Sequence, residues 1–380
     1  MKNYLEFEKD IKTLEDEMEL LKSPGNESIS EVDTSKIKST QDQINSKLKS
    51  IYSSLNSWQK TQVARHEDRP RASFYIRKIF NNFTPLAGDR YFGDDRSVTT
   101  GFGLINEKSV LVIGQEKGED LNTRIEKNFG MMSPEGYRKC IRLMKLADRF
   151  KIPIITFIDT PGAYPGIGAE QRGQASAIAH SIECCMSLRV PNISVIIGEG
   201  GSGGAIALAS SNKVIMLENA IYSVISPEGC ASILWRDPGK SLEAAEAMKL
   251  SAQDLLKLGV IDDIIPEPLG GAHRNHEETA QKIDIEIKSV IDDQYKRAKD
   301  ILVEKIDALH ASAEALLEYE TIEGKHIHEI LEHGKIVSEV LKVAEITEKS
   351  EKQDDQSSEE SEEEQIEEID PGAEPAGAPA

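Results

Sequence analysis

The sequence of 380 residues is poor in cysteine, in aromatic side chains and in long apolar runs. Its only cysteines are Cys140, Cys184, Cys185 and Cys230, and no two of them have the Cys-x-x-Cys spacing. The absence of this spacing argues against a zinc ribbon in this chain, so we expect no bound metal. We expect four free thiols that behave as small core residues rather than as disulfides.

Membrane and export signals are also missing from the sequence. No apolar run approaches the roughly 20 residues that a membrane-spanning helix needs. The N-terminus has neither a basic segment followed by an apolar one nor the Arg- and Ser-rich character of a transit peptide. We therefore expect no membrane span and a cytoplasmic location.

Positive charge is in deficit, and the deficit is uneven along the chain. The formal net charge is −21, and the last 30 residues hold 12 acidic residues and one lysine, which leaves −11 on this segment. Such an acidic balance argues against general nucleic-acid binding. The composition of residues 350–380 predicts an acidic, disordered tail.

What the sequence does have is a glycine-rich turn at its centre. The β-branched run Ile193–Ile197 predicts a buried strand, and the small apolar residues after Gly204 predict a closely packed helix. Between them lie five glycines and Ser202. A helix that begins in this way exposes backbone N–H groups at its positive end, where an anion or a developing oxyanion can bind.

Other interpretations of this turn remain open from the residues alone. It matches the dinucleotide-binding fingerprint, although the helix before Ser211 is short for a βαβ crossover. It also matches a nucleophile elbow, with Ser202 as nucleophile and Asp237 and His273 as partners. A phosphate-binding P-loop is excluded because no Lys-Ser or Lys-Thr pair follows. The glycines could also serve close packing alone.

The remaining chain predicts helices at both ends and alternating strands and helices between them. Apolar spacing predicts two N-terminal helices, and a Ser-Pro-Glu-Gly segment with a capping serine opens two later ones. Lys117 and Arg124 are predicted either in a solvated loop or on a rim that faces an anion. The predicted helices are 1–22, 34–65, 133–150, 170–188, 242–250, 252–258 and 282–348, and the predicted strands are 99–105, 110–113, 153–158, 214–217, 220–225 and 260–268.

Several long runs of this sequence resemble the α subunit of the carboxyltransferase component of bacterial-type acetyl-CoA carboxylase. They are specific because they are numerous and consecutive, and the likeness covers about residues 3–280. The runs are Ala64–His66, Ala87–Arg90, Asn128–Met131, Ser133–Lys139, Pro153–Gly166, Gly198–Ala205, Tyr222–Trp235 and Ile264–Asn275. The chain departs from the family's usual pattern at Glu67, at Pro85 and beyond about residue 285.

The resemblance implies an α/β fold, a crotonase-like (ClpP/crotonase) ββα superhelix with N-terminal helices and a helical C-terminal extension. The activity it implies is transfer of a carboxyl group from carboxybiotin, on a biotin carboxyl carrier protein, to acetyl-CoA, which gives malonyl-CoA for fatty acid synthesis. It also implies an α2β2 complex in which the β subunit holds zinc and binds acetyl-CoA, with biotin carboxylase as a further partner. A serine hydrolase and a non-catalytic scaffold are the alternatives.

The site residues also come from the resemblance. Gly203, Gly204 and Ala205 are implied as backbone donors of an oxyanion hole for carboxybiotin. The implied substrate-binding residues are Gly200, Gly201, Gly162, Ala163 and Tyr164. No cofactor is expected to be covalently bound, since carboxybiotin and acetyl-CoA are substrates.

The predicted domain organisation has four parts. A helical region covers residues 1–63, and the carboxyltransferase domain covers 64–285, with a possible family boundary near residue 36. A helical extension follows over 286–349, and the acidic tail covers 350–380.

Overall fold

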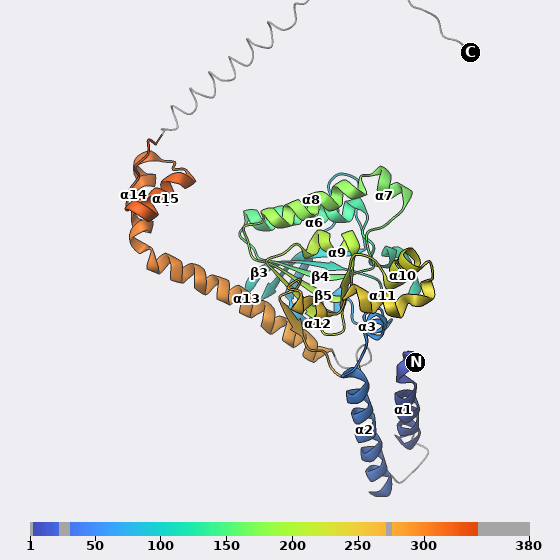
Figure 1. The fold of residues 1–380 in the computed structure, drawn as a ribbon. Coiled ribbons are helices and arrows are strands. Elements are labelled where there is room, and N and C mark those ends of the chain that lie inside the picture. The colour runs from blue at the N-terminus through green and yellow to red at the C-terminus, as the bar shows by residue number, and fades with distance from the viewer. Residues whose placement is uncertain (1–2, 23–30, 271–275, 341–380) are drawn as a thin grey trace, which may run out of the picture. The chain divides into compact units, whose positions relative to one another are not determined.

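The computed structural model describes residues 3–22, 31–270 and 276–340. The chain divides into two compact units, residues 1–292 and 293–380, each of which is described by itself. Figure 1 traces the chain by residue number.

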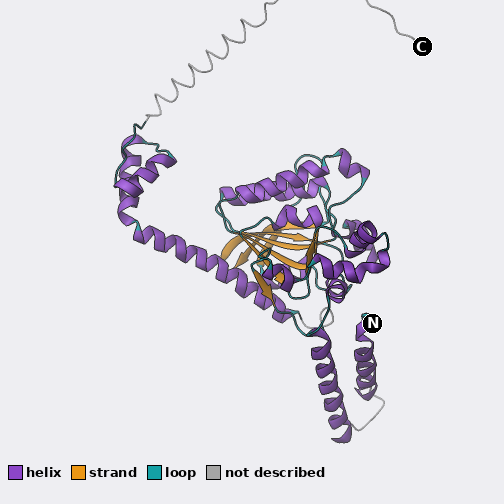
Figure 2. Cartoon of the chain, in the orientation of Figure 1, coloured by secondary structure: helices purple, strands orange, loops and turns teal. Residues whose placement is uncertain are grey.

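A mixed eight-stranded sheet lies at the centre of the first unit (Figure 2). The strands are β1 (Asn81–Pro85), β2 (Val98–Ile105), β3 (Lys108–Gln115), β4 (Ile154–Thr160), β5 (Asn192–Gly201), β6 (Lys213–Leu217), β7 (Ile221–Ser223) and β8 (Asp263–Ile265). Their order is β1-β2-β3-β4-β5-β6-β8, and β7 pairs with the far end of β5. The pairs β1–β2 and β2–β3 are antiparallel, whereas the others are parallel. The predicted α/β class is confirmed.

β5 is the central strand, and it is buried along its whole length. Its first half pairs with β6 and its last three residues, Glu199 to Gly201, pair with β7. The sheet therefore splits beside the glycine turn. β4 runs parallel to β5 on the other side, with Thr160 opposite Gly200, so both strands deliver their following loops to the same edge.

Helices cover both faces of the sheet. α6 (Pro134–Arg149) and α8 (Gln174–Ser187) lie side by side on one face, with α9 (Ser202–Ala209) between α8 and the strands (Figure 1). The buried isoleucines Ile283, Ile287 and Ile291 pack the first half of α13 (Glu277–Glu304) into the same core. Further helices of this unit are α3 (Ser57–Ala64), α4 (Ala72–Ile79), α5 (Leu121–Glu126), α7 (Ile167–Gln171), α10 (Pro227–Trp235), α11 (Ser241–Met248), α12 (Ala252–Lys257) and the 3-10 turns η1 (Glu6–Glu8), η2 (Asn128–Gly130) and η3 (Pro238–Lys240).

The N-terminal apolar stripes were predicted correctly, but the second helix is broken. α1 (Lys9–Lys22) and α2 (Glu31–Tyr52) pack through Ile11, Ile44 and Leu48. The helix predicted over 34–65 ends at Tyr52. A new helix, α3, begins after Asn56, whose side chain accepts a hydrogen bond from the backbone N–H of Gln59. That cap gives the chain a better local alternative than a continuous helix.

The strands predicted over 99–105 and 110–113 are present as β2 and β3, which form a hairpin, and other boundaries are corrected. Asn106 and Glu107 both have positive φ, at 47° and 64°, as a two-residue hairpin turn requires. The helix predicted over 170–188 is interrupted at Gly173, which has a φ of 79°. The strand predicted over 220–225 is only β7, and the one predicted over 260–268 is only β8. β1 was not predicted.

The C-terminal helices confirm a helical extension with interruptions. α13 (Glu277–Glu304) begins in the first unit, and α14 (Ile306–Tyr319) and α15 (Gly324–His333) lie in the second. Helix was predicted through residue 348, whereas the last described helix ends at His333, with Gly334 in a left-handed conformation after it. Residues 341–380, including the predicted tail from 350, lie outside the described residues.

Candidate functional site

The glycine turn joins β5 to α9 as the sequence predicts. Gly201 ends β5, and Ser202 begins α9 with a positive φ of 49°. No side chain caps this helix. By helix geometry, the backbone N–H groups of Gly201 to Gly204 have no acceptor within α9, and they lie at its positive end. Ala205 is the first residue whose N–H is placed to donate within the helix.

The loop after β4 packs directly against this turn. A Cβ added to Gly204 would lie 2.5 Å from the carbonyl carbon of Gly162 and 2.8 Å from the amide nitrogen of Ala163. A Cβ added to Gly201 would lie 2.2 Å from the carbonyl oxygen of Pro161. The structure therefore brings together predicted site residues from two separate loops, and only glycine permits their approach.

The other predicted residues lie around this contact. Tyr164 is half-buried, and its N–H donates to the Met132 carbonyl over 3.0 Å. Gly200 lies against Tyr222 of β7. Gly203 has room around it, because its added Cβ would meet nothing closer than Ile178 at 3.6 Å.

A buried ionic network lies next to the two loops, and sequence reasoning assigned it no function. Asp159 and Glu199 are the carboxylates nearest to the loops in sequence. Lys117 Nζ lies 2.8 Å from Asp159 Oδ1 and 3.0 Å from Glu199 Oε2. Arg71 pairs with Asp159 at 3.2 Å, and Arg65 pairs with Glu199 at 2.7 Å.

The network keeps its carboxylates ionised. Burial disfavours the charged form of Asp159, but Lys117 and Arg71 outweigh it and hold the pKa of Asp159 below its ordinary value. Burial acts in the same direction on Glu199, and there Lys117 and Arg65 hold the pKa below its ordinary value. Both carboxylates are therefore negative at neutral pH, and their charge is balanced locally.

Gln115 is a second residue that sequence reasoning missed. It is the last residue of β3, and it is fully buried. Its Nε2 donates to the Gly204 carbonyl over 2.9 Å, and its Oε1 accepts from the Asp159 N–H over 3.2 Å. A glutamine at the end of a buried strand, where apolar residues otherwise continue, is the only signal that could have marked it.

Two sequence interpretations need correction. Lys117 is neither in a solvated loop nor on an anion-facing rim, because its charge is used by Asp159 and Glu199. Arg124 lies on α5, and its Nη1 lies 3.4 Å from Glu67 Oε1.

The side chain of Ser133 does not cap α6, whereas the side chain of Ser226 does cap α10. The backbone N–H of Ser133 donates to Asp95 Oδ2.

The nucleophile-elbow interpretation finds no triad in the part of the chain that is described. Asp237 accepts a hydrogen bond from the Gly239 N–H and caps η3. His273 lies outside the described residues. Ser202 is exposed, and it has the strand-to-helix position and the positive φ of an elbow serine.

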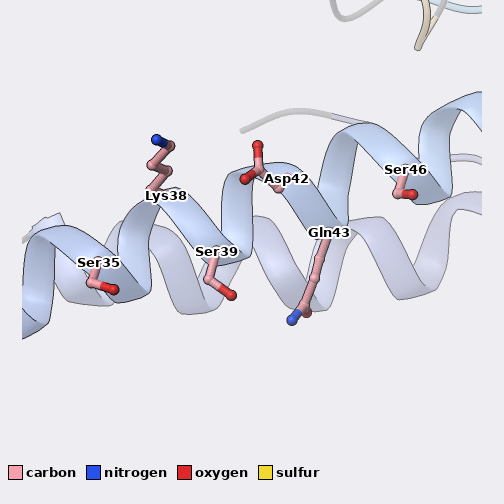
Figure 3. Close-up of a pocket in the computed structure, with 6 residues that line it drawn as sticks. All are labelled: Ser35, Lys38, Ser39, Asp42, Gln43 and Ser46. Carbon is pink, nitrogen blue, oxygen red and sulfur yellow. The ribbon is translucent and has the colours of Figure 1, made fainter.

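A hollow on α2 is not a competing site (Figure 3). All the side chains that line it come from this one helix, and all are polar and largely exposed. They are Ser35, Lys38, Ser39, Asp42, Gln43 and Ser46. Among the described residues, no group of three or more His, Cys, Asp or Glu side chains could hold a metal ion. None of the described helices is both long and apolar enough to cross a membrane.

Comparison with known proteins gives consistent matches. The family model of acetyl co-enzyme A carboxylase carboxyltransferase-like proteins matches residues 4–311. The acetyl-coenzyme A carboxylase carboxyl transferase subunit alpha of Pelagibacter ubique (strain HTCC1062) is 70% identical over 278 residues, 73% of this chain and 76% of that protein. Its counterpart in Cereibacter sphaeroides (strain ATCC 17029) is 54% identical over 304 residues, 79% of this chain and 94% of that protein.

Among solved structures, one match is transcarboxylase 12S with methylmalonyl-coenzyme A and methylmalonic acid bound. It has a TM-score of 0.47 and 18% sequence identity, and the match covers 59% of this chain and 44% of that one.

Proposed function

This chain belongs to the acetyl-CoA carboxylase carboxyltransferase family, in the α-subunit group, and from that premise we propose how its two glycine loops work. The chain is the carboxyltransferase α subunit of acetyl-CoA carboxylase, a transferase with a crotonase-like fold that acts with a β subunit. It takes part in the transfer of a carboxyl group to acetyl-CoA, which yields malonyl-CoA.

The β5–α9 turn provides the oxyanion hole on this subunit. The backbone N–H groups of Gly203 and Gly204 stabilise the negative oxygen that develops on the biotin ureido group as the carboxyl group leaves. Ala205 follows Gly204 in the same turn, and its N–H is the first that is placed to donate within α9. The observation that carries this assignment is the uncapped start of α9, packed so closely on Gly162 and Ala163 that no side chain fits.

The β4 loop shapes the pocket beside that hole. Gly162, Ala163 and Tyr164 line one side, and Gly200 and Gly201 line the other. Loss of one backbone donor from such a hole costs about 100- to 1000-fold in rate. No side-chain nucleophile is required, because the donors act on charge that the substrates themselves develop.

The proposed partners follow from the family. The β subunit supplies the acetyl-CoA site and the zinc ribbon, and two copies of each subunit form an α2β2 complex. The biotin carboxyl carrier protein delivers carboxybiotin, which biotin carboxylase regenerates. The complex works in the cytoplasm. Residues 64–285 form the carboxyltransferase domain, preceded by the helical region 1–63 and followed by the extension 286–349 and the tail 350–380.

The function can be tested by reconstitution. We expect the purified chain mixed with a β-type subunit to convert malonyl-CoA to acetyl-CoA in the presence of biocytin, whereas either subunit alone is inactive. Ser202→Ala should keep most of this activity, because the Ser202 hydroxyl has no role in the proposed mechanism. Turnover by this chain alone would contradict the proposal, as would labelling of Ser202 by a fluorophosphonate probe with esterase turnover.

A further inference from the structure

Asp159 lies where the two glycine loops meet. It is the penultimate residue of β4, directly before the loop that leads to Gly162. Its Oδ1 accepts from the backbone N–H of Glu199 over 3.0 Å, and Glu199 lies immediately before Gly200 and Gly201 at the end of β5. Lys117 and Arg71 hold the same carboxylate from the other sides, and only 1% of the Asp159 side chain is exposed.

The backbone of Asp159 is tied to the other end of the same turn. Its N–H donates to Gln115, and Gln115 in turn donates to the Gly204 carbonyl. Asp159 is therefore connected to Glu199 within the glycine turn and, through the Gln115 side chain, to the first turn of α9. The approach needs Gly198, since a Cβ there would lie 2.5 Å from Asp159 Oδ1.

We propose that Asp159 is a positioning residue that holds the β4 loop and the start of α9 in the geometry that carboxyl transfer requires. The inference rests on the proposed function, but its structural part can be measured without it. Asp159 is enclosed by protein groups, so it acts through the two loops it connects. A displacement of about 1 Å in an oriented site can lower the rate by about 100-fold.

The chain offers a matched control in the Arg69–Glu267 pair. These side chains are as buried as Asp159, and Arg69 Nη2 lies 2.9 Å from Glu267 Oε1. Arg69 also donates to the Ile197 carbonyl of β5, so this pair is anchored to the same strand ahead of its glycines rather than to either glycine loop. Glu267→Gln and Asp159→Asn each remove one buried negative charge that faces arginine, so both should lower the melting temperature.

The first experiment measures amide hydrogen exchange of the full chain without partner or substrate. Asp159→Asn should speed exchange of the helical amides of α9, residues 205–209, by at least about tenfold, while the amides of α6 change by less than about threefold. Glu267→Gln should leave the difference in amide exchange rate between α9 and α6 as it is in the unmodified chain. Equal changes in α9 and α6 for Asp159→Asn would overturn the proposal.

The second experiment measures steady-state transfer from malonyl-CoA to biocytin by the complex with the β-type subunit. Asp159→Asn should lower kcat by about 10- to 100-fold and change KM by less than about threefold, whereas Glu267→Gln keeps kcat within about twofold. Parallel losses of kcat in both variants would mean that Asp159 only stabilises the fold. An inactive unmodified complex would refute the proposed function, and the exchange result would still decide the positioning role.

A third variant keeps the proposal testable if Asp159→Asn does not fold. Gln115→Met preserves the volume of the side chain and leaves the ionic network intact, but it removes the bridge from Asp159 to Gly204. It should speed α9 exchange by at least about threefold and lower kcat with little change in KM. Unmodified exchange and kcat in Gln115→Met would contradict the proposal.

Discussion

Neighbouring glycines in the central turn have different reasons to be glycine. A methyl group on Gly204 would lie less than 3 Å from backbone atoms of Gly162 and Ala163, whereas one on Gly203 would meet only the flexible end of Ile178. Backbone atoms that belong to another loop cannot move aside as a side-chain end can. The motif alone does not distinguish these two positions.

This difference predicts opposite effects of the same substitution. Gly204→Ala should lower the free energy of unfolding by about 1–3 kcal/mol through overpacking. Gly203→Ala should leave it unchanged or raise it by up to about 1 kcal/mol, because alanine favours the helix. Urea denaturation of both variants measures the two changes in the free energy of unfolding. Equal destabilisation by the two would mean that the close contact of Gly204 with the β4 loop is absent.

Asp89 predicts a pH dependence of stability. Its Oδ1 accepts from the N–H groups of Tyr91, Phe92 and Gly93, and Arg138 pairs with its Oδ2. Burial opposes ionisation, but these partners lower the pKa of Asp89 to about 2 from 3.8. A depressed pKa stabilises the fold above the ordinary value, and this contribution is lost as pH falls from about 4 toward 2.

Asp89→Asn should therefore cost about 2 kcal/mol of unfolding free energy at pH 7. The difference from the unmodified chain should be constant above pH 5 and shrink below about pH 4. Denaturation at a series of pH values measures it, with the exposed Asp42→Asn as a control that changes stability by less than about 0.5 kcal/mol. A difference that does not depend on pH would contradict the argument.

At the residue level, the loops could be predicted from sequence but their ionic support could not. The position of the glycine turn was predicted because strand, turn and helix signals are local, whereas the roles of Gly203, Gly204 and Gly162 were implied by the family resemblance. Lys117 has the same local signature as a solvated lysine, since its partner Asp159 is far away in the chain. Charge pairing between distant segments leaves no trace in spacing or hydropathy.

Whole elements show the same division between local and distant causes. The strands and helices of the core were predicted because their apolar periodicity is strong. The interruptions at Asn56 and Gly173 were missed, since a cap or a single left-handed residue decides them against a continuing apolar stripe. Two identical Ser-Pro-Glu-Gly starts behave differently, because the N–H of Gly136 donates to the Ser133 carbonyl, whereas the N–H of Gly229 donates to Ser226 Oγ.

The two helix starts therefore give a matched test. In α10, Ser226 Oγ accepts from the Gly229 N–H over 3.1 Å, whereas no such bond caps α6. Ser226→Ala should lower the free energy of unfolding by about 1 kcal/mol. Ser133→Ala should change it by less than about 0.5 kcal/mol. Chemical denaturation compares the two, and a larger loss for Ser133→Ala would reverse the assignment of the cap.

For the molecule as a whole, charge and family likeness are separated along the chain. The family model ends at residue 311, whereas about half of the net charge of −21 lies on the last 30 residues. The acidic tail therefore lies outside the segment to which the activity is assigned. Its effect on the enzyme should be electrostatic and long-range rather than chemical.

Truncation after Lys349 tests this separation. The shortened chain, combined with the β-type subunit, should keep kcat within about twofold. Its KM for malonyl-CoA should fall modestly at low salt, because −11 of charge no longer repels an anionic substrate. The difference should fade near 0.15 M salt, where the Debye length is about 8 Å. Steady-state kinetics at low and high salt measure both effects, and a large loss of kcat at either salt concentration would place the tail in the working complex.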